Sequence, residues 1–142
     1  MKISELMKTN VEVCRLDELV ESVAERMRAR NIGFLPVCDE SGVIVGTVTD
    51  RDLTTRVLGE RRRPESTTAG EEMTRDVVSC AASDDLMIAE ELMSKYKVSR
   101  VVCLDDTRRP IGVVSLSDVA GAESRGKASA VLRSVSQRES HS

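Results

Sequence analysis

Aromatic side chains and histidine are nearly absent from this chain. Phe34 and Tyr96 are its aromatic residues, 1% of 142, and tryptophan does not occur. Proteins that bind single-stranded nucleic acid stack the bases on aromatic side chains, so this class of function is nearly excluded. The single histidine, His141, lies next to the C-terminus. Its position removes most histidine-based catalysis and nearly all histidine-containing zinc sites.

The chain also lacks a basic surplus and long apolar runs. It has 21 Lys and Arg against 24 Asp and Glu, a formal net charge of −3. A DNA-binding protein has an excess of basic residues, whereas the one dense basic run here, residues 61–63, is short and isolated. No apolar run exceeds four residues. We therefore expect a cytoplasmic protein with no signal peptide, no membrane span and no nucleic-acid partner.

The four cysteines lie more than twenty residues apart and form no C-x-x-C motif. This spacing favours buried free thiols in a reducing compartment, and no metal site is expected. A thiol-based redox or metal sensor is the weaker alternative. The residues concerned are Cys14, Cys38, Cys80 and Cys103.

The sequence contains an internal repeat with an offset of 66 residues, which runs without a gap from Met7 to Asp118. Identities are modest in number, but the residue type is kept at many more positions. Identical pairs include Met7 with Met73, Val11 with Val77, Cys14 with Cys80, Met27 with Met93, Gly46 with Gly112 and Asp52 with Asp118.

Both copies predict the same order of elements, β-α-β-β-α. Apolar residues at helical spacing predict one helix in each copy, and two β-branched stretches around a polar turn predict a hairpin. The expected strands are residues 11–14, 34–38 and 43–48 in the first copy and 77–80, 101–104 and 111–114 in the second. The expected helices are 19–27 and 86–96, with a short closing helix from Asp50 or Ser117 onward.

A unit of about 50 residues is too small to bury a convincing core alone, so the two copies should pack together. We predict an α+β fold of two repeats with small sheets and flanking helices. The predicted divisions are repeat 1 at 1–58, a polar linker at 59–70, repeat 2 at 71–122, and a C-terminal helix and polar tail at 123–142. The apolar pairs Val23 with Met27 and Ala89 with Met93 suit either a second chain or the internal core.

Each copy has the pattern G-h-h-[ST]-x-x-D where its last strand meets its last helix. The residues are Gly46, Thr49 and Asp52, and Gly112, Ser115 and Asp118. The hydroxyl and carboxylate form a capping box, which satisfies backbone N–H groups at a helix start. Capping does not explain the glycine, which in a strand marks a bulge or a close approach to the backbone. Its recurrence at the same offset favours a ligand.

This arrangement suits a nucleotide. A helix N-terminus attracts phosphate, and a Thr or Ser hydroxyl there can donate to a phosphate oxygen. A carboxylate one turn later accepts from two vicinal hydroxyls, which ribose has. Aliphatic strand residues would then take the purine.

These features resemble the cystathionine β-synthase (CBS) domain, here as the tandem pair called a Bateman module. The resemblance covers residues 1–122 and includes Leu6-Met7, the segment Ile32-x-x-Leu35-Pro36-Val37 with Asp39 and Gly42, and both G-h-h-[ST]-x-x-D patterns. It implies two repeats about a pseudo-two-fold axis with two clefts that, in many members, bind AMP, ADP, ATP or S-adenosylmethionine.

The resemblance also implies roles for individual residues. Aspartates would hold ribose hydroxyls, hydroxyl residues would contact ribose or phosphate, two arginines would contact phosphate, and apolar residues would line the purine pockets. Copy two has Ser117 where copy one has Arg51, and Val102 where it has Pro36, so unequal sites are expected. The candidate residues are Asp52 and Asp118; Thr49 and Ser115; Arg51 and Arg100; and Val11, Ile32, Phe34, Pro36, Val77 and Val98.

Because no nucleophile-base pair is visible, we expect a regulatory ligand-binding module and not an enzyme. It would bind an adenine nucleotide, form a homodimer, and signal through conformation or assembly to an unidentified effector protein. The alternative is a ligand-independent assembly protein in which the Thr/Ser-x-x-Asp motifs only cap helices.

Overall fold

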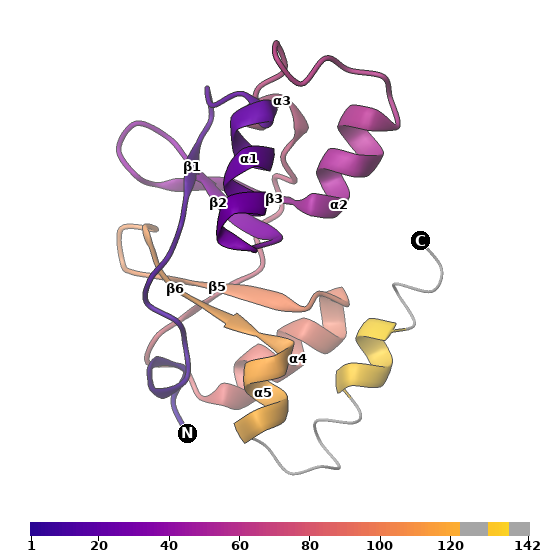
Figure 1. Ribbon diagram of the computed structural model, residues 1–142. Helices are drawn as coiled ribbons and strands as arrows, with labels where there is room; N and C mark the ends of the chain where they lie inside the picture. Colours follow the sequence, from indigo (N-terminus) through magenta and orange to yellow (C-terminus); the bar gives the residue numbers. More distant parts are fainter. Residues whose placement is uncertain (123–130, 137–142) are drawn as a thin grey trace. The chain divides into compact units, whose positions relative to one another are not determined.

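The computed structural model describes residues 1–122 and 131–136. The chain forms two compact units. We call residues Glu12–Val77 the first-repeat unit, and residues Met1–Val11 with Val78–Ser142 the second-repeat unit. Each contains one three-stranded sheet with helices beside it (Figure 1). The predicted α+β class with two small sheets is confirmed.

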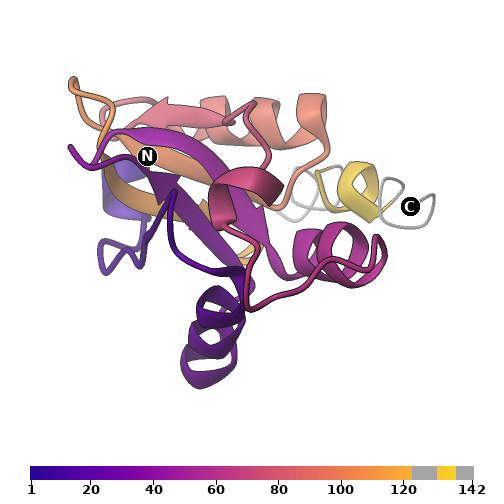
Figure 2. The same cartoon turned by 90° about the horizontal axis from the view of Figure 1, so that it is seen from above.

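The first-repeat unit is built on the strand order β1-β2-β3. Strand β1 is parallel to β2, and β2 forms an antiparallel hairpin with β3. Figures 1 and 2 show α1 and the continuous α2–η2 segment as two separate helices beside this hairpin. The elements are β1 (Cys14–Arg15), α1 (Val20–Arg30), β2 (Phe34–Cys38), β3 (Ile44–Thr49), α2 (Asp50–Asp52), the π-helical η2 (Leu53–Leu58) and α3 (Ala69–Glu72).

The second-repeat unit has the equivalent order β4-β5-β6, with β4 parallel to β5 and β5 antiparallel to β6. Its elements are η1 (Ile3–Glu5), β4 (Ser79–Ala81), α4 (Leu86–Tyr96), β5 (Arg100–Leu104), β6 (Pro110–Ser115) and α5 (Leu116–Ala122). A further helical segment covers residues 131–136. The order β-α-β-β-α predicted for both copies is therefore present.

Aspartates at equivalent positions shape the two hairpin turns. The Asp39 carboxylate accepts from the backbone N–H groups of Ser41 and Val43 at 2.9 and 3.1 Å. The Asp105 carboxylate accepts from the Thr107 hydroxyl at 2.6 Å and from the Arg109 N–H at 2.9 Å. These hydrogen bonds lower the pKa of Asp105, and the bond from the Thr107 hydroxyl has the largest effect. Asp39 and Asp105 therefore stabilise the hairpin turns.

The compact units divide the chain at other points than the predicted boundaries. The first eleven residues belong with the second repeat, where Lys8 forms an isolated antiparallel bridge with Val113. Residues 59–77 belong with the first repeat, where Thr74 forms the equivalent bridge with Thr47. The segment that precedes each repeat thus packs on the last strand of the other repeat.

The last residues of the predicted polar linker, 67–70, are docked on the first-repeat unit. The Val20 N–H donates to the Thr67 carbonyl at 2.8 Å, which satisfies a donor at the start of α1. The Ala69 N–H donates to the Glu18 carbonyl at 2.8 Å. Glu72 is 4% exposed, and its carboxylate lies 2.7 Å from the Arg62 guanidinium. Backbone hydrogen bonds hold this polar segment in place, together with one ion pair in which the carboxylate is buried and the Arg62 side chain is 46% exposed.

The apolar faces of α1 and α4 are used inside the units. Val23 and Met27 lie in the core of the first-repeat unit, and Ala89 and Met93 in that of the second. All four are at most 6% exposed, so they are not available to a second chain. In residues 131–136, Val131 joins the second core and Ser134 donates to the Ser94 carbonyl at 3.2 Å. Residues 131–136 of the predicted terminal helix therefore cover a core edge, while the rest of that prediction, which includes Ala128 and the tail 137–142, lies outside the described residues.

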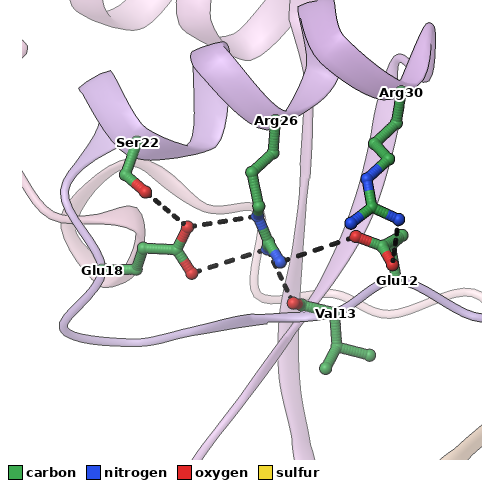
Figure 3. Close-up of polar contacts among 6 residues, drawn as sticks. All are labelled: Glu12, Val13, Glu18, Ser22, Arg26 and Arg30. Carbon is green, nitrogen blue, oxygen red and sulfur yellow. Dashed lines mark hydrogen bonds and ion pairs between the residues drawn. The ribbon is translucent and has the colours of Figure 1, made fainter.

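A network of charged side chains fixes the chain before β1 on α1 (Figure 3). Arg26 donates to the Val13 carbonyl at 2.7 Å, and its Nε lies 3.3 Å from a Glu18 carboxylate oxygen. Glu12 forms ion pairs with Arg26 at 3.7 Å and with Arg30 at 3.4 Å. Because the Arg26 side chain is 31% exposed, its pairs with Glu12 and Glu18 are partly shielded from water and position residues 12–18 more firmly than exposed pairs would.

Over residues 1–122 and 131–136, no helix has the length and apolarity needed to cross a membrane.

Candidate ligand-binding site

The first candidate site is the turn where β3 becomes α2, residues 49–52, which we call the first-repeat turn. Thr49 is the N-cap of α2, and its hydroxyl accepts from the Asp52 N–H at 3.1 Å. The Asp52 carboxylate accepts in return from the Thr49 N–H at 2.9 Å. The Asp52 side chain is 14% exposed. Both bonds of the predicted capping box are therefore present.

The second-repeat turn, residues 115–118, has the same geometry where β6 becomes α5. The Asp118 N–H donates to the Ser115 hydroxyl at 3.2 Å, and the Ser115 N–H donates to the Asp118 carboxylate at 3.0 Å. The Ser115 hydroxyl also lies 2.9 Å from the Ser117 hydroxyl, and either oxygen can be the donor. The first-repeat turn has Arg51 at the position of Ser117.

The capping bonds leave hydrogen-bonding capacity for a ligand. A hydroxyl group has one proton and two lone pairs, and a carboxylate has about four lone-pair positions. Thr49 uses one lone pair to accept from Asp52, so its proton remains available to an acceptor. Asp52 Oδ2 accepts from the Thr49 N–H, so lone pairs on both carboxylate oxygens remain. Capping and ribose binding are therefore chemically compatible at the same residues.

Arg56 is a neighbour of Asp52 that the sequence reasoning missed. Its Nε lies 3.7 Å from Asp52 Oδ1, and its Nη1 donates to the Glu72 carbonyl at 2.9 Å. The available signal was the i,i+4 spacing of an acid and a base on one helix. The second repeat has Ala122 at the equivalent position. Only the first of these two carboxylates thus has a helical arginine one turn away.

Strand pairing brings one predicted residue beside each turn. Phe34 is opposite Thr49 in the β2–β3 register, and Arg100 is opposite Ser115 in the β5–β6 register. The Arg100 side chain is exposed, and its Nη1 donates to the Ser99 hydroxyl at 3.2 Å. The structure therefore groups Phe34 with Thr49 and Asp52, and Arg100 with Ser115 and Asp118.

The other predicted residues occupy less direct positions. Pro36 is buried opposite Thr47, Ile32 packs against the first core, and Arg51 is exposed on α2. The remaining three are half-buried: the Val98 N–H donates to the Met93 carbonyl at 3.2 Å, and Val11 and Val77 lie where the chain passes from one unit to the other.

The expectation that the two strand glycines make room for a ligand needs correction. A Cβ on Gly46 would lie 2.5 Å from Met73 Sδ and 2.8 Å from the Thr74 carbonyl oxygen. A Cβ on Gly112 would contact the Met7 side chain in the same way. The chain segment that carries Met73 or Met7, and not a ligand, therefore lies close to the backbone of each glycine. The ladder is also irregular beside each glycine, which agrees with the bulge interpretation.

The described residues contain no group of three or more His, Cys, Asp or Glu side chains that could hold a metal ion. All four cysteines are free and buried, as predicted.

Comparison with known proteins identifies the family. The model of the CBS domain matches residues 3–59 and again residues 69–125. The chain belongs to the CBS domain family. The CBS domain-containing protein YhcV of Bacillus subtilis is 29% identical over 140 residues, which cover 98% of each chain.

Solved structures of CBS pairs have the same fold. The CBS domain pair of protein MJ0100, in complex with 5′-methylthioadenosine and S-adenosyl-L-methionine, aligns with a TM-score of 0.76 and 26% identity. The alignment covers 85% of the present chain and 94% of that one. CBSX2 in complex with AMP aligns with a TM-score of 0.74 and 24% identity, over 85% and 94% of the two chains. The resemblance to the CBS family predicted from the sequence is confirmed.

Proposed function

We propose that this CBS pair is a regulatory module that binds an adenosine-containing ligand at the first-repeat and second-repeat turns. The observation that carries the proposal is the repeated turn itself. Each turn holds a part-buried Asp carboxylate and a Thr or Ser hydroxyl at a helix start, and both keep hydrogen-bonding capacity after capping. Asp52 and Asp118 would accept from the ribose hydroxyls, and Thr49 and Ser115 would contact ribose or phosphate.

The ligand class is supported by the CBS domain pair of MJ0100, which is 26% identical to the present chain. That pair was solved with two adenosine compounds that carry no phosphate. Ribose and adenine are the groups these compounds share with AMP, ADP and ATP, so the turns suit the whole class. Within that class we propose an adenine nucleotide, because each turn has an arginine nearby for phosphate: Arg51 in the first repeat, and Arg100 opposite Ser115 in the second.

The two sites should be unequal. In the first-repeat turn Asp52 Oδ1 also faces Arg56 at 3.7 Å, so a ribose hydroxyl has to share this oxygen with a guanidinium. In the second-repeat turn the Ser115 hydroxyl already forms a hydrogen bond with the Ser117 hydroxyl. We propose that these differences give the two turns different affinities for the same ligand.

We also propose that ligand binding alters assembly as a homodimer or with an effector protein. The support is an apolar cavity of about 330 Å³ between α1 and η2, which is lined in part by Leu58, a leucine that is 67% exposed. Exposed apolar side chains that gather on one surface are a common feature of interaction sites. Four free thiols suit a reducing compartment such as the cytoplasm.

Thermal unfolding with AMP, ADP, ATP, S-adenosylmethionine and 5′-methylthioadenosine tests the proposal. A ligand at 100 times its Kd should add about 2.7 kcal/mol to the free energy of unfolding, a rise in Tm of roughly 5–10 °C for a chain of this size. The double variant Asp52→Asn with Asp118→Asn is the control and should show a much smaller rise. If none of the five compounds raises the Tm of protein freed of carried-over nucleotide, the assembly alternative is favoured.

A further inference from the structure

Two buried thiols face each other in the core of the second-repeat unit. Cys80 on β4 is in direct register with Cys103 on β5. Their sulfur atoms lie 3.5 Å apart. Cys80 is 9% exposed and Cys103 is fully buried. Their side chains therefore lie on the same face of two adjacent parallel strands, in contact with each other.

The first repeat shows that the core does not require this pair. With the 66-residue offset, Cys80 corresponds to Cys14 and Cys103 corresponds to Val37. Cys14 is in direct register with Val37, and both are fully buried. A Cys–Val pair thus fills the equivalent position in the same fold. The second thiol of the Cys80–Cys103 pair is an addition that packing alone does not demand.

The backbone places the two residues within reach of a covalent bond. Adjacent strands lie about 4.8 Å apart, and disulfide-bonded residues have Cα separations of about 4.4–6.8 Å. The sulfurs must approach from 3.5 Å to about 2.05 Å, a movement that side-chain rotation supplies. We propose that Cys80 and Cys103 form a reversible disulfide when the protein meets a hydroperoxide, so that the second-repeat unit responds to oxidation.

The chemistry needs one hydroperoxide molecule. A thiolate attacks the O–O bond of hydrogen peroxide, forms a sulfenic acid and releases hydroxide, which takes up a proton to become water. The second thiolate attacks the sulfenic sulfur, forms the S–S bond and expels a second hydroxide, which also becomes water. In sum, two thiols lose two electrons and two protons, and one peroxide becomes two waters. A small dithiol reverses the reaction by thiol–disulfide exchange.

The surroundings distinguish this pair from the other two cysteines. The hydrogen bond between the thiols raises the pKa of Cys80 and lowers the pKa of Cys103, because it stabilises a thiolate on Cys103 that accepts the Cys80 S–H. Burial raises the pKa of Cys14 to about 12, and burial also raises the pKa of Cys38. The thiolate is the reactive form, so oxidation should start in the Cys80–Cys103 pair.

Thiol counting tests the proposal. Reduced protein should show four thiols after denaturation. After treatment of the folded protein with hydrogen peroxide and removal of the oxidant, two should remain. Peptide mapping should find one Cys80–Cys103 link, and dithiothreitol should restore all four thiols.

Two variants make the result specific. Cys103→Val copies the Cys–Val pair of the first repeat, so it should fold and keep its three thiols under the same treatment. The double variant Cys14→Ala with Cys38→Ala should lose both of its thiols as a disulfide. The proposal is overturned if the untreated and treated proteins both show four thiols, if sulfinic acid forms in place of the link, or if Cys103→Val loses two thiols as readily as the original chain.

Discussion

Replacement of Asp52 by alanine should weaken binding of the adenosine ligand at the first-repeat turn by about 1.5–3 kcal/mol, or roughly 10- to 150-fold in Kd. The Asp52 carboxylate has lone pairs enough to accept from two vicinal hydroxyls while it caps α2. Its removal leaves both ribose hydroxyls without their charged acceptor. Isothermal titration of the variant with the ligand that most raises the Tm of the original chain measures the loss.

The Asp52→Asn variant separates ligand binding from capping. The asparagine side-chain oxygen can still accept from the Thr49 N–H, so stability without ligand should stay close to that of the original chain. The affinity should nevertheless fall, because asparagine has one acceptor oxygen and no charge. If Asp52→Asn binds the ligand as tightly as the original chain, Asp52 serves only as a cap. Asp118→Asn makes the same test at the second-repeat turn.

Alanine at either strand glycine should destabilise the protein by about 1–3 kcal/mol through overpacking, with Gly46→Ala at the upper end. At Gly46 the new Cβ meets a backbone oxygen, that of Thr74 at 2.8 Å, which is fixed by the bridge between Thr74 and Thr47. At Gly112 the three nearest atoms all belong to the Met7 side chain. Urea unfolding of the two variants measures both costs.

A second substitution distinguishes these two clashes. Met7→Ala should relieve much of the cost of Gly112→Ala, whereas Met73→Ala should leave most of the cost of Gly46→Ala in place, because the Thr74 carbonyl remains. Gly121→Ala is the control, since a Cβ there meets nothing within 4 Å. Equal costs for Gly46→Ala and Gly121→Ala would mean that the preceding segment does not pack on β3 as described.

Local sequence patterns were sufficient to predict the strands, the long helices and the closing helix of each unit, whereas the short η1 and α3 were not predicted. The helices α1 and α4 follow from apolar residues at helical spacing, and the strands β2 and β5 from β-branched and apolar runs. The capping boxes at the first-repeat and second-repeat turns are also local, because each joins residues three positions apart. Periodicity and spacing report such short-range interactions directly.

The sequence did not predict that the segment before each repeat packs on the last strand of the other repeat. Lys8 and Val113 are 113 − 8 = 105 residues apart, and no periodic signal connects them. For the same reason the two strand glycines, Gly46 and Gly112, indicated a close approach to the backbone. They did not show that the approaching residues are Met73 and Met7. The contact of Cys80 with Cys103 likewise depends on the register of β4 against β5. Long-range pairing decided each of these features.

Equilibrium dialysis of ligand-free protein against radiolabelled AMP, ATP and S-adenosylmethionine tests most directly whether this CBS pair binds an adenosine compound. We expect saturable binding of at least one of them to the original chain. We also expect a marked loss of that binding in the double variant Asp52→Asn with Asp118→Asn, at unchanged stability. Absence of saturable binding for every compound, or undiminished binding by the double variant, would overturn the proposed function.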